Sequence, residues 1–261
     1  MRTFFTLLDR ELKSFFYSPI AYVVLFYFLL LTGFNFYSGA SFLNRGPTEI
    51  TVVEAFFNTV IFWFPFVLIF PLITMRTYSE EFRMGTFETL TTAPVSDWQV
   101  VLSKFFGVLF FYIILWLPSF SYFAIFQFIT KQQAANASGA YYGSYLLLLL
   151  IGMFYISIGC LASALTKDQI NAAVISFSAI TLCFFAGLLT FVMNITDPAM
   201  KDINTYISAV EHMGDFSKGM IDTRPIVWYL SLTVLMLVAD QRNSRTAAPS
   251  PASMRRVTTT T

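Results

Sequence analysis

Charged residues are scarce in this chain of 261 residues, and seven of them lie between Arg76 and Lys104. The adjacent Glu80 and Glu81 could act as the paired acids of an intramembrane protease, but that chemistry also needs histidine ligands within the spans. The chain has one histidine, His212, far along the sequence from these acids. No stretch matches G-x-x-x-x-G-K-[ST], the loop that cradles nucleotide phosphates. We therefore predict that the chain is not an enzyme and binds no cofactor or metal of its own.

The elements that position these residues are those of a membrane protein. Hydrophobic residues make up 56% of the chain, aromatic residues 18% and charged residues only 12%, which lies outside the usual range of soluble domains. The net charge of +1 comes from short loops and predicts no nucleic-acid partner. Cys160 and Cys183 both lie in apolar runs, so no disulfide framework is expected.

We predict an all-α polytopic fold in which residues 20–239 form a domain of six transmembrane helices. A crossing needs about 20 apolar residues, and six runs approach or exceed that length. The predicted spans are Ile20–Tyr37, Ala55–Met75, Trp98–Ile129, Tyr145–Leu165, Ile170–Met193 and Pro225–Ala239. Small residues at Gly159 and Ser163, and at Ala179, Cys183 and Gly187, predict close packing of the fourth and fifth spans.

The distribution of lysine and arginine predicts the orientation. With both termini in the cytoplasm, eleven of the sixteen Lys and Arg residues lie on the cytoplasmic side and five on the other. Cytoplasmic loops carry an excess of these residues. The loop after the second span is then cytoplasmic, and residues 194–224 form an extracytoplasmic loop with short helices.

The N-terminal segment, residues 1–19, has the pattern of an amphipathic helix that lies in the membrane interface. Its large apolar residues share one face, and Glu11 is a misfit on it. We predict that Phe4, Leu8, Leu12 and Phe15 point towards the bilayer, so that the segment forms an interfacial elbow helix before the first span. A low-complexity tail at residues 240–261 is predicted to be disordered.

We call residues 76–98 the coupling segment. Thr77 with Glu80, and Ser96 with Gln99, have the spacing of two capping boxes, and Gly85 interrupts the first short helix. Such a polar segment has no core of its own to bury. We therefore predict that a protein outside the membrane grips it.

The coupling segment resembles the first cytoplasmic loop of type-2 ABC transporter permeases, and among them that of the permease subunit associated with gliding motility. Both have an acidic and basic run, a Gly-Thr-x-Glu-x-Leu turn, a Pro-Val-Ser step and a Ser-Lys-Phe at the start of the next span. These features lie at Glu80, Glu81, Arg83, Gly85-Thr86, Glu88, Leu90, Pro94 to Ser96 and Ser103 to Phe105. The similarity extends from Ser18 to about residue 238.

The resemblance implies a permease subunit of an ATP-driven exporter in the bacterial cytoplasmic (inner) membrane. Its partners would be a separate ABC ATPase subunit, which holds ATP and Mg²⁺, and a second permease chain, identical or homologous. The side chains of Phe82, Phe87 and Leu90 would enter a groove on the ATPase. The full set of residues predicted to dock the ATPase is Tyr78, Glu80, Glu81, Phe82, Arg83, Gly85, Thr86, Phe87, Glu88, Leu90, Lys167 and Asp168.

The alternative is a membrane scaffold or a secondary carrier that works without an ATPase. Carriers driven by protons or ions usually need an ionisable residue at membrane depth. Nearly every charge in this chain lies in a loop or at the end of a span. A secondary carrier is therefore the weaker hypothesis, and the ABC permease is the stronger one.

Overall fold

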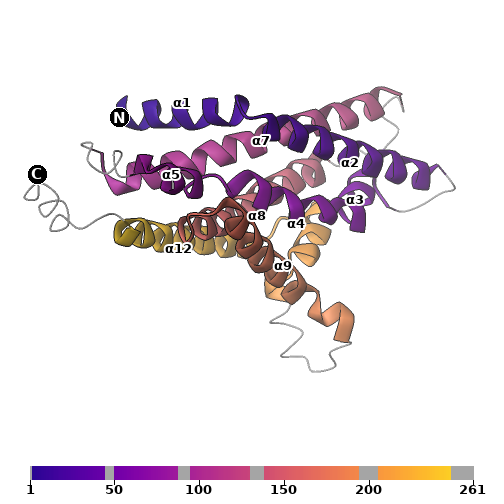
Figure 1. Ribbon diagram of the computed structural model, residues 1–261. Coiled ribbons are helices and arrows are strands. Elements are labelled where there is room, and N and C mark those ends of the chain that lie inside the picture. Colours follow the sequence, from indigo (N-terminus) through magenta and orange to yellow (C-terminus); the bar gives the residue numbers. More distant parts are fainter. Residues whose placement is uncertain (1, 45–49, 88–94, 130–137, 194–204, 248–261) are drawn as a thin grey trace, which may run out of the picture.

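The computed structural model describes residues 2–44, 50–87, 95–129, 138–193 and 205–247. All the regular elements in these ranges are helices, which confirms the predicted all-α class. Figure 1 shows them as one elongated bundle with a shorter arm. Their bounds are α1 Arg2–Phe16, α2 Pro19–Leu43, α3 Val52–Phe57, α4 Val60–Thr74, α5 Ser79–Met84, α7 Asp97–Ile129, α8 Ser138–Ala164, α9 Gln169–Met193, α11 Ala209–Ser217 and α12 Thr223–Ala247.

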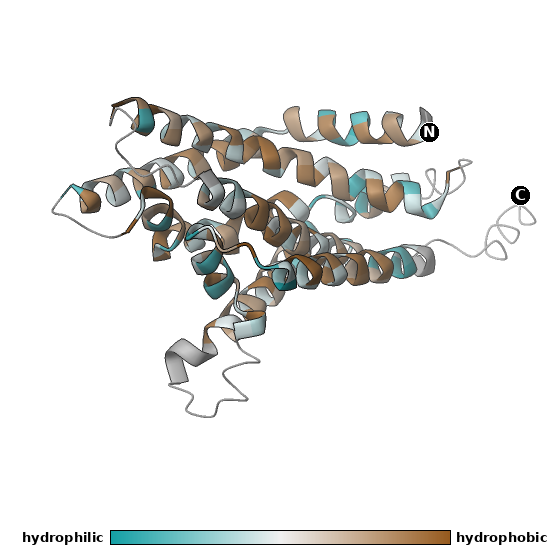
Figure 2. Ribbon diagram, turned by 180° about the vertical axis from the view of Figure 1, so that it is seen from behind, coloured by the Kyte–Doolittle hydropathy of each residue, from teal (hydrophilic) through white to brown (hydrophobic). Residues whose placement is uncertain are grey.

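Six helical segments in the described part of the chain are long and apolar enough to cross a membrane. They correspond in order to the six predicted spans, and Figure 2 shows hydrophobic residues along most of their length. The start of α1, the short helix α5 and the end of α12 lie at the same end of the bundle (Figure 1). That arrangement agrees with two termini on one side, while the cytoplasmic identity of this side stays a prediction.

The second predicted span is broken in the structure. The helix α3 begins with a capping box between Thr51 and Glu54 and ends at Phe57, and α4 begins at Val60. At the break, the side chain of Asn58 donates to Ser217 Oγ at 3.1 Å, and Thr59 Oγ1 donates to the Ala55 carbonyl at 2.6 Å. These side-chain hydrogen bonds compete with continuation of the helix.

The central helix of the bundle is α8, the most buried of the six spans, which packs against α12, α9, α11, α7 and α4. The fourth and fifth spans pack against each other as predicted, since α8 contacts α9, but Gly159 does not make this contact. A Cβ atom on Gly159 would overlap the side chain of Thr74, so this face packs against the end of α4. Gly187 of α9 also faces elsewhere, because a Cβ there would lie 2.9 Å from Ser208 Cα, just before α11.

The amphipathic helix α1 packs on protein. Phe4, Leu8, Leu12 and Phe15 are all half-buried. The ring of Phe4 contacts Phe106 at 6.4 Å between centroids, and the ring of Phe15 stacks on Phe111 at 5.3 Å. Both partners belong to α7. Gly107 of α7 allows α1 to come this close, because a Cβ atom on Gly107 would lie 2.9 Å from Glu11 Cβ. Much of the predicted lipid-facing surface is thus covered by α7, and the position of α1 in a bilayer stays a prediction.

The last span continues beyond its predicted end. The prediction ends the span at Ala239 and makes residues 240–261 disordered, whereas α12 runs to Ala247. Polar residues extend it because they find partners on neighbouring helices: the Asn243 side chain donates to the Ala164 carbonyl at 2.8 Å, and Asp240 accepts from the Tyr78 hydroxyl at 2.9 Å. Residues 248–261 lie outside the described ranges. In the predicted extracytoplasmic loop, α11 is a short helix as expected, and residues 194–204 lie outside the described ranges.

Candidate functional site

The first half of the coupling segment forms the short helix α5. It ends at Gly85, which has a φ of +70° and caps the helix in the left-handed conformation that glycine adopts without strain. Arg83, Met84, Gly85 and Thr86 are exposed at this tip, with Met84 58% exposed. The tip is therefore a small surface available to a partner.

The predicted capping box between Thr77 and Glu80 does not form. Tyr78 occupies the N-cap position without a side-chain cap, and Thr77 is buried. The Glu80 carboxylate instead binds Arg76, with Nε–Oε2 and Nη2–Oε1 distances of 2.7 and 3.0 Å. Arg76 also donates to the Ser18 hydroxyl, so the guanidinium joins the end of α4 to the junction of α1 and α2. In the second predicted box, the Ser96 amide donates to Gln99 Oε1 at 3.3 Å.

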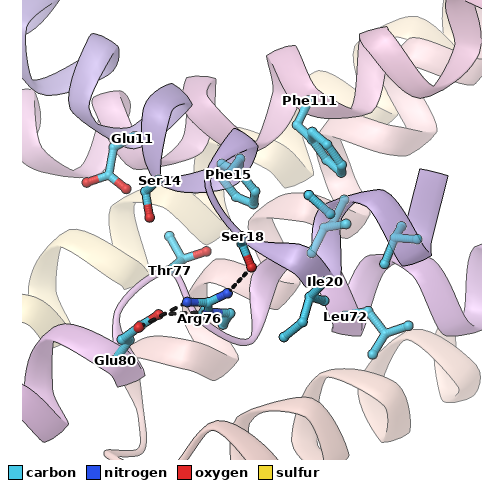
Figure 3. A pocket seen from close by; sticks show the side chains of 13 residues that line it. Glu11, Ser14, Phe15, Ser18, Ile20, Leu72, Arg76, Thr77, Glu80 and Phe111 are labelled. Atoms are coloured by element: carbon cyan, nitrogen blue, oxygen red, sulfur yellow. Dashed lines mark hydrogen bonds and ion pairs between the residues drawn. The ribbon is translucent and has the colours of Figure 1, made fainter.

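Figure 3 shows the cleft around this guanidinium, with Glu80 and Ser18 on either side of it. Its polar side is formed by residues such as Ser14 and Thr77 and its apolar side by residues such as Phe111. The volume open to the centres of water molecules is about 40 Å³, and about 10–15 Å³ by this measure holds one water molecule. The cleft therefore has room for a few water molecules beside the Arg76 guanidinium.

The start of α5 is held by one hydroxyl group of α8. Ser163 Oγ accepts from the Tyr78 and Ser79 amides at 3.0 and 3.2 Å, and donates to the Met75 carbonyl at 3.1 Å. These amides belong to the first turn of a helix, where no intrahelical partner exists. The close approach permitted by Gly159, one helical turn earlier, brings Ser163 to this position.

Beneath α5 lies a cluster of ion pairs, which we define as Arg10, Glu11, Glu81 and Lys104 and call the Lys104 cluster. Arg10 is half-exposed, and the other three side chains are largely buried. The ammonium of Lys104, on α7, is 1% exposed. It donates to Glu11 Oε1 at 3.2 Å and to the Thr77 carbonyl at 2.7 Å, and lies 2.9 Å from Glu81 Oε2. Arg10 binds the same two acids, at 3.0 Å to Glu11 and 2.8 Å to Glu81. The cluster therefore joins α1, α5 and α7.

The charges in the cluster balance, two cations against two carboxylates. Burial opposes ionisation of Glu11, but the Lys104 ammonium and the Arg10 guanidinium outweigh it and hold the pKa of Glu11 below its ordinary value. Burial also lowers the pKa of Arg10, and the two acids more than compensate, so that this pKa is raised. Removing one member would leave a buried charge without its partner, which is far more costly than the pair itself is stabilising.

Several residues predicted to dock an ATPase are turned into the chain. Tyr78 is fully buried, Phe87 is 4% exposed, and Phe82 packs between them with its ring centroid 4.7 Å from that of Phe87. Tyr78 and Phe87 therefore have almost no surface left for the groove of a partner, whereas Phe82 is half-buried. Glu80 and Glu81 are likewise engaged within the chain.

The remaining predicted docking residues have different outcomes. Glu88 and Leu90 lie outside the described residues. Lys167 and Asp168 are exposed on the turn between α8 and α9, and α5 contacts α9. Arg83, Gly85 and Thr86 are exposed on the tip of α5, and their role in docking stays a prediction.

Sequence reasoning missed the Lys104 cluster. Two signals for it exist: Glu11 is the one acid on the apolar face of α1, and Lys104 stands inside the apolar third span. Within the described part of the chain, no group of three or more His, Cys, Asp and Glu residues could hold a metal ion.

The fold and this site define a multi-pass helical membrane protein whose exposed polar tip is tied by buried ion pairs to its spans. Comparison with family models gives the more specific identity, since residues 48–210 match the family described as ABC-2 family transporter protein. The match covers more than half of the chain, and the chain belongs to this family. It is therefore a membrane component of an ABC transporter rather than a nucleotide-binding one, and the family implies an ABC ATPase partner. A search of curated proteins finds no match.

Proposed function

We propose that this chain is the permease subunit of an ATP-driven exporter, and that it docks its ATPase subunit through the tip of α5 and the turn between α8 and α9. The observation that carries the proposal is the Lys104 cluster. It fastens the base of the exposed tip to helices that contain or precede membrane spans.

The proposed docking surface consists of Arg83, Met84, Thr86, Lys167 and Asp168. Met84 supplies the apolar contact, because its flexible thioether fits irregular grooves. Arg83, Lys167 and Asp168 supply charges of both signs at the rim. This surface replaces the aromatic docking set expected from the sequence.

Movement of the tip would be passed on through buried contacts. A displacement of α5 pulls α1 through Glu81 and Arg10, and α7 through Glu81 and Lys104. Ser163 adds α8 to the connected set. Because packed interiors are stiff, these helices would follow the tip as rigid bodies, which is how domain motions are commonly transmitted.

We propose the wider assembly on the basis of family membership. ATP and Mg²⁺ would bind to the ATPase subunit, and a second permease chain, identical or homologous, would complete the pathway in the bacterial inner membrane. Membership of an ABC family favours this assembly over the scaffold or secondary carrier considered from the sequence. A role of the gliding-motility type is the finer proposal, supported by the residues of the coupling segment alone.

The test is co-purification of the full chain with the ABC ATPase subunit encoded beside it. We expect Met84→Asp to reduce the amount of ATPase recovered at least tenfold. The substitution removes the apolar contact that Met84 would make and places a carboxylate in an apolar groove of the ATPase. The matched control is Met220→Asp, since Met220 is 56% exposed but follows α11 at a distance from α5. Equal recovery of the ATPase with both variants would contradict the proposed surface.

A further inference from the structure

One buried carboxyl group next to the Lys104 cluster has no cation of its own among the described residues. Asp240 of α12 is 1% exposed. Its Oδ2 accepts a hydrogen bond from the Tyr78 hydroxyl at 2.9 Å. Its Oδ1 is buried and has no hydrogen-bond partner within the described part of the chain. Glu81 Oε2 and Thr77 Oγ1 also have no hydrogen-bond partner there, but the first is paired with Lys104 and the second is a hydroxyl, so Asp240 is the carboxyl group that no cation offsets.

The nearest ammonium cannot neutralise Asp240 without leaving its present partners. Of the three N–H donors of Lys104, two are directed to Glu11 and to the Thr77 carbonyl, and the ammonium also forms an ion pair with Glu81 at 2.9 Å. The ammonium lies over the ring of Tyr78, 5.1 Å from its centroid. Tyr78 thus stands between the ammonium and the carboxyl group.

The charges around Asp240 do not balance if it is ionised. The surrounding elements contribute the following titratable groups: Arg10 and Glu11 from α1, Tyr78 and Glu81 from the start of α5, Lys104 from α7 and the buried thiol of Cys160 from α8. Ionised Asp240 would make three carboxylates against two cations, and Asp240 and Lys104 are each only 1% exposed. Proteins rarely keep such an unpaired charge and hold the neutral form instead.

We propose that Asp240 is a proton-binding site, and that its proton controls the Lys104 cluster. With the proton bound, the neutral acid accepts from Tyr78 and leaves the cluster intact. When the O–H bond of the acid breaks and the proton passes to water, the new carboxylate draws Lys104 away from Glu11 and Glu81. Proton release then loosens α5 from α1 and α7. The consequence for transport rests on the proposed function, whereas the proton site itself does not.

The experiment is infrared spectroscopy of the full chain in lipid nanodiscs, without an ATPase, as the pH is raised from neutral. We expect the C=O stretching band of a protonated carboxylic acid at neutral pH, its conversion to carboxylate bands at higher pH, and its absence in Asp240→Asn. Asp168→Asn, which removes an exposed acid, is the matched control and should keep the band. Carboxylate bands alone at neutral pH would overturn the proposal.

A second variant keeps the test decisive if Asp240→Asn does not fold. Tyr78→Phe removes the hydroxyl that donates to the acid, so we expect the band to move to higher frequency. An unchanged frequency would assign the band to another acid and overturn the proposal. Since neither measurement involves an ATPase, loss of ATPase binding and loss of the proton site are separately detectable.

Discussion

Substitution of Lys104 by methionine tests the central feature of the site. Methionine keeps the length of the side chain but leaves Glu11 and Glu81 without the ammonium that they share. Breaking a buried ion pair by removing one partner costs about 3–5 kcal/mol. We take the lower end, about 3 kcal/mol, because Arg10 still binds both acids. At about 2–4 °C per kcal/mol for a chain of this size, the midpoint of thermal unfolding in detergent should fall by roughly 6–12 °C.

Lys13→Met is the matched control, because the Lys13 ammonium is exposed and forms its ion pair with the equally exposed Asp9. Exposed ion pairs contribute little to stability, so the control should unfold at the same temperature as the unaltered chain. Adding Glu11→Gln to Lys104→Met should cost less than the sum of the two single changes, since it removes one of the stranded charges. Equal unfolding temperatures for Lys104→Met and Lys13→Met would refute the ion-pair argument.

Three further changes test other parts of the structure. The pKa of Glu11 is lower in the folded chain than its ordinary value of about 4.5. Ionised Glu11 therefore stabilises the folded chain fully above pH 4.5, and this contribution is lost as the pH falls through the folded-state pKa. Glu11→Gln should accordingly flatten the acid side of a plot of unfolding temperature against pH. Gly159→Ala forces a methyl group into Thr74 and should destabilise the chain by about 1–3 kcal/mol, measured as a lower unfolding temperature; Gly139→Ala, with open space around it, should not. In Gly85→Ala the alanine must adopt a φ of +70°, which costs about 1–2 kcal/mol. The backbone amides at the tip of α5 should then exchange hydrogen faster, and slower exchange would contradict the strain.

The number and order of the spans could be predicted from the sequence because each span is a long apolar run, which no other part of the chain imitates. The boundaries could not all be predicted in the same way. Asn58 ends α3 through a partner, Ser217, that lies far away in the sequence. In the sequence, Asp240 and Asn243 look like the start of a polar tail. In the structure they remain helical because they bind Tyr78, just before α5, and Ala164 at the end of α8.

The docking surface shows the same limit more sharply. Tyr78, Phe82 and Phe87 have the composition of a contact surface, and nothing local to them distinguishes a partner's groove from the chain's own interior. The distinction depends on Ser163 and Asp240, which hold the segment from α8 and α12. The charged partners of Glu81 are likewise contributed by α1 and α7.

The separation of Glu11 and Lys104 has a consequence for how the chain is made. Lys104 follows Glu11 by 93 positions in the sequence, and synthesis at 5–20 residues per second needs roughly 5–19 seconds to cover that distance. During this time α1 exists without α7, and we expect its apolar face to lie on the surface of the bilayer. The amphipathic pattern would then serve the newly made chain, and α1 would exchange lipid contacts for contacts with α7 once Lys104 has been made.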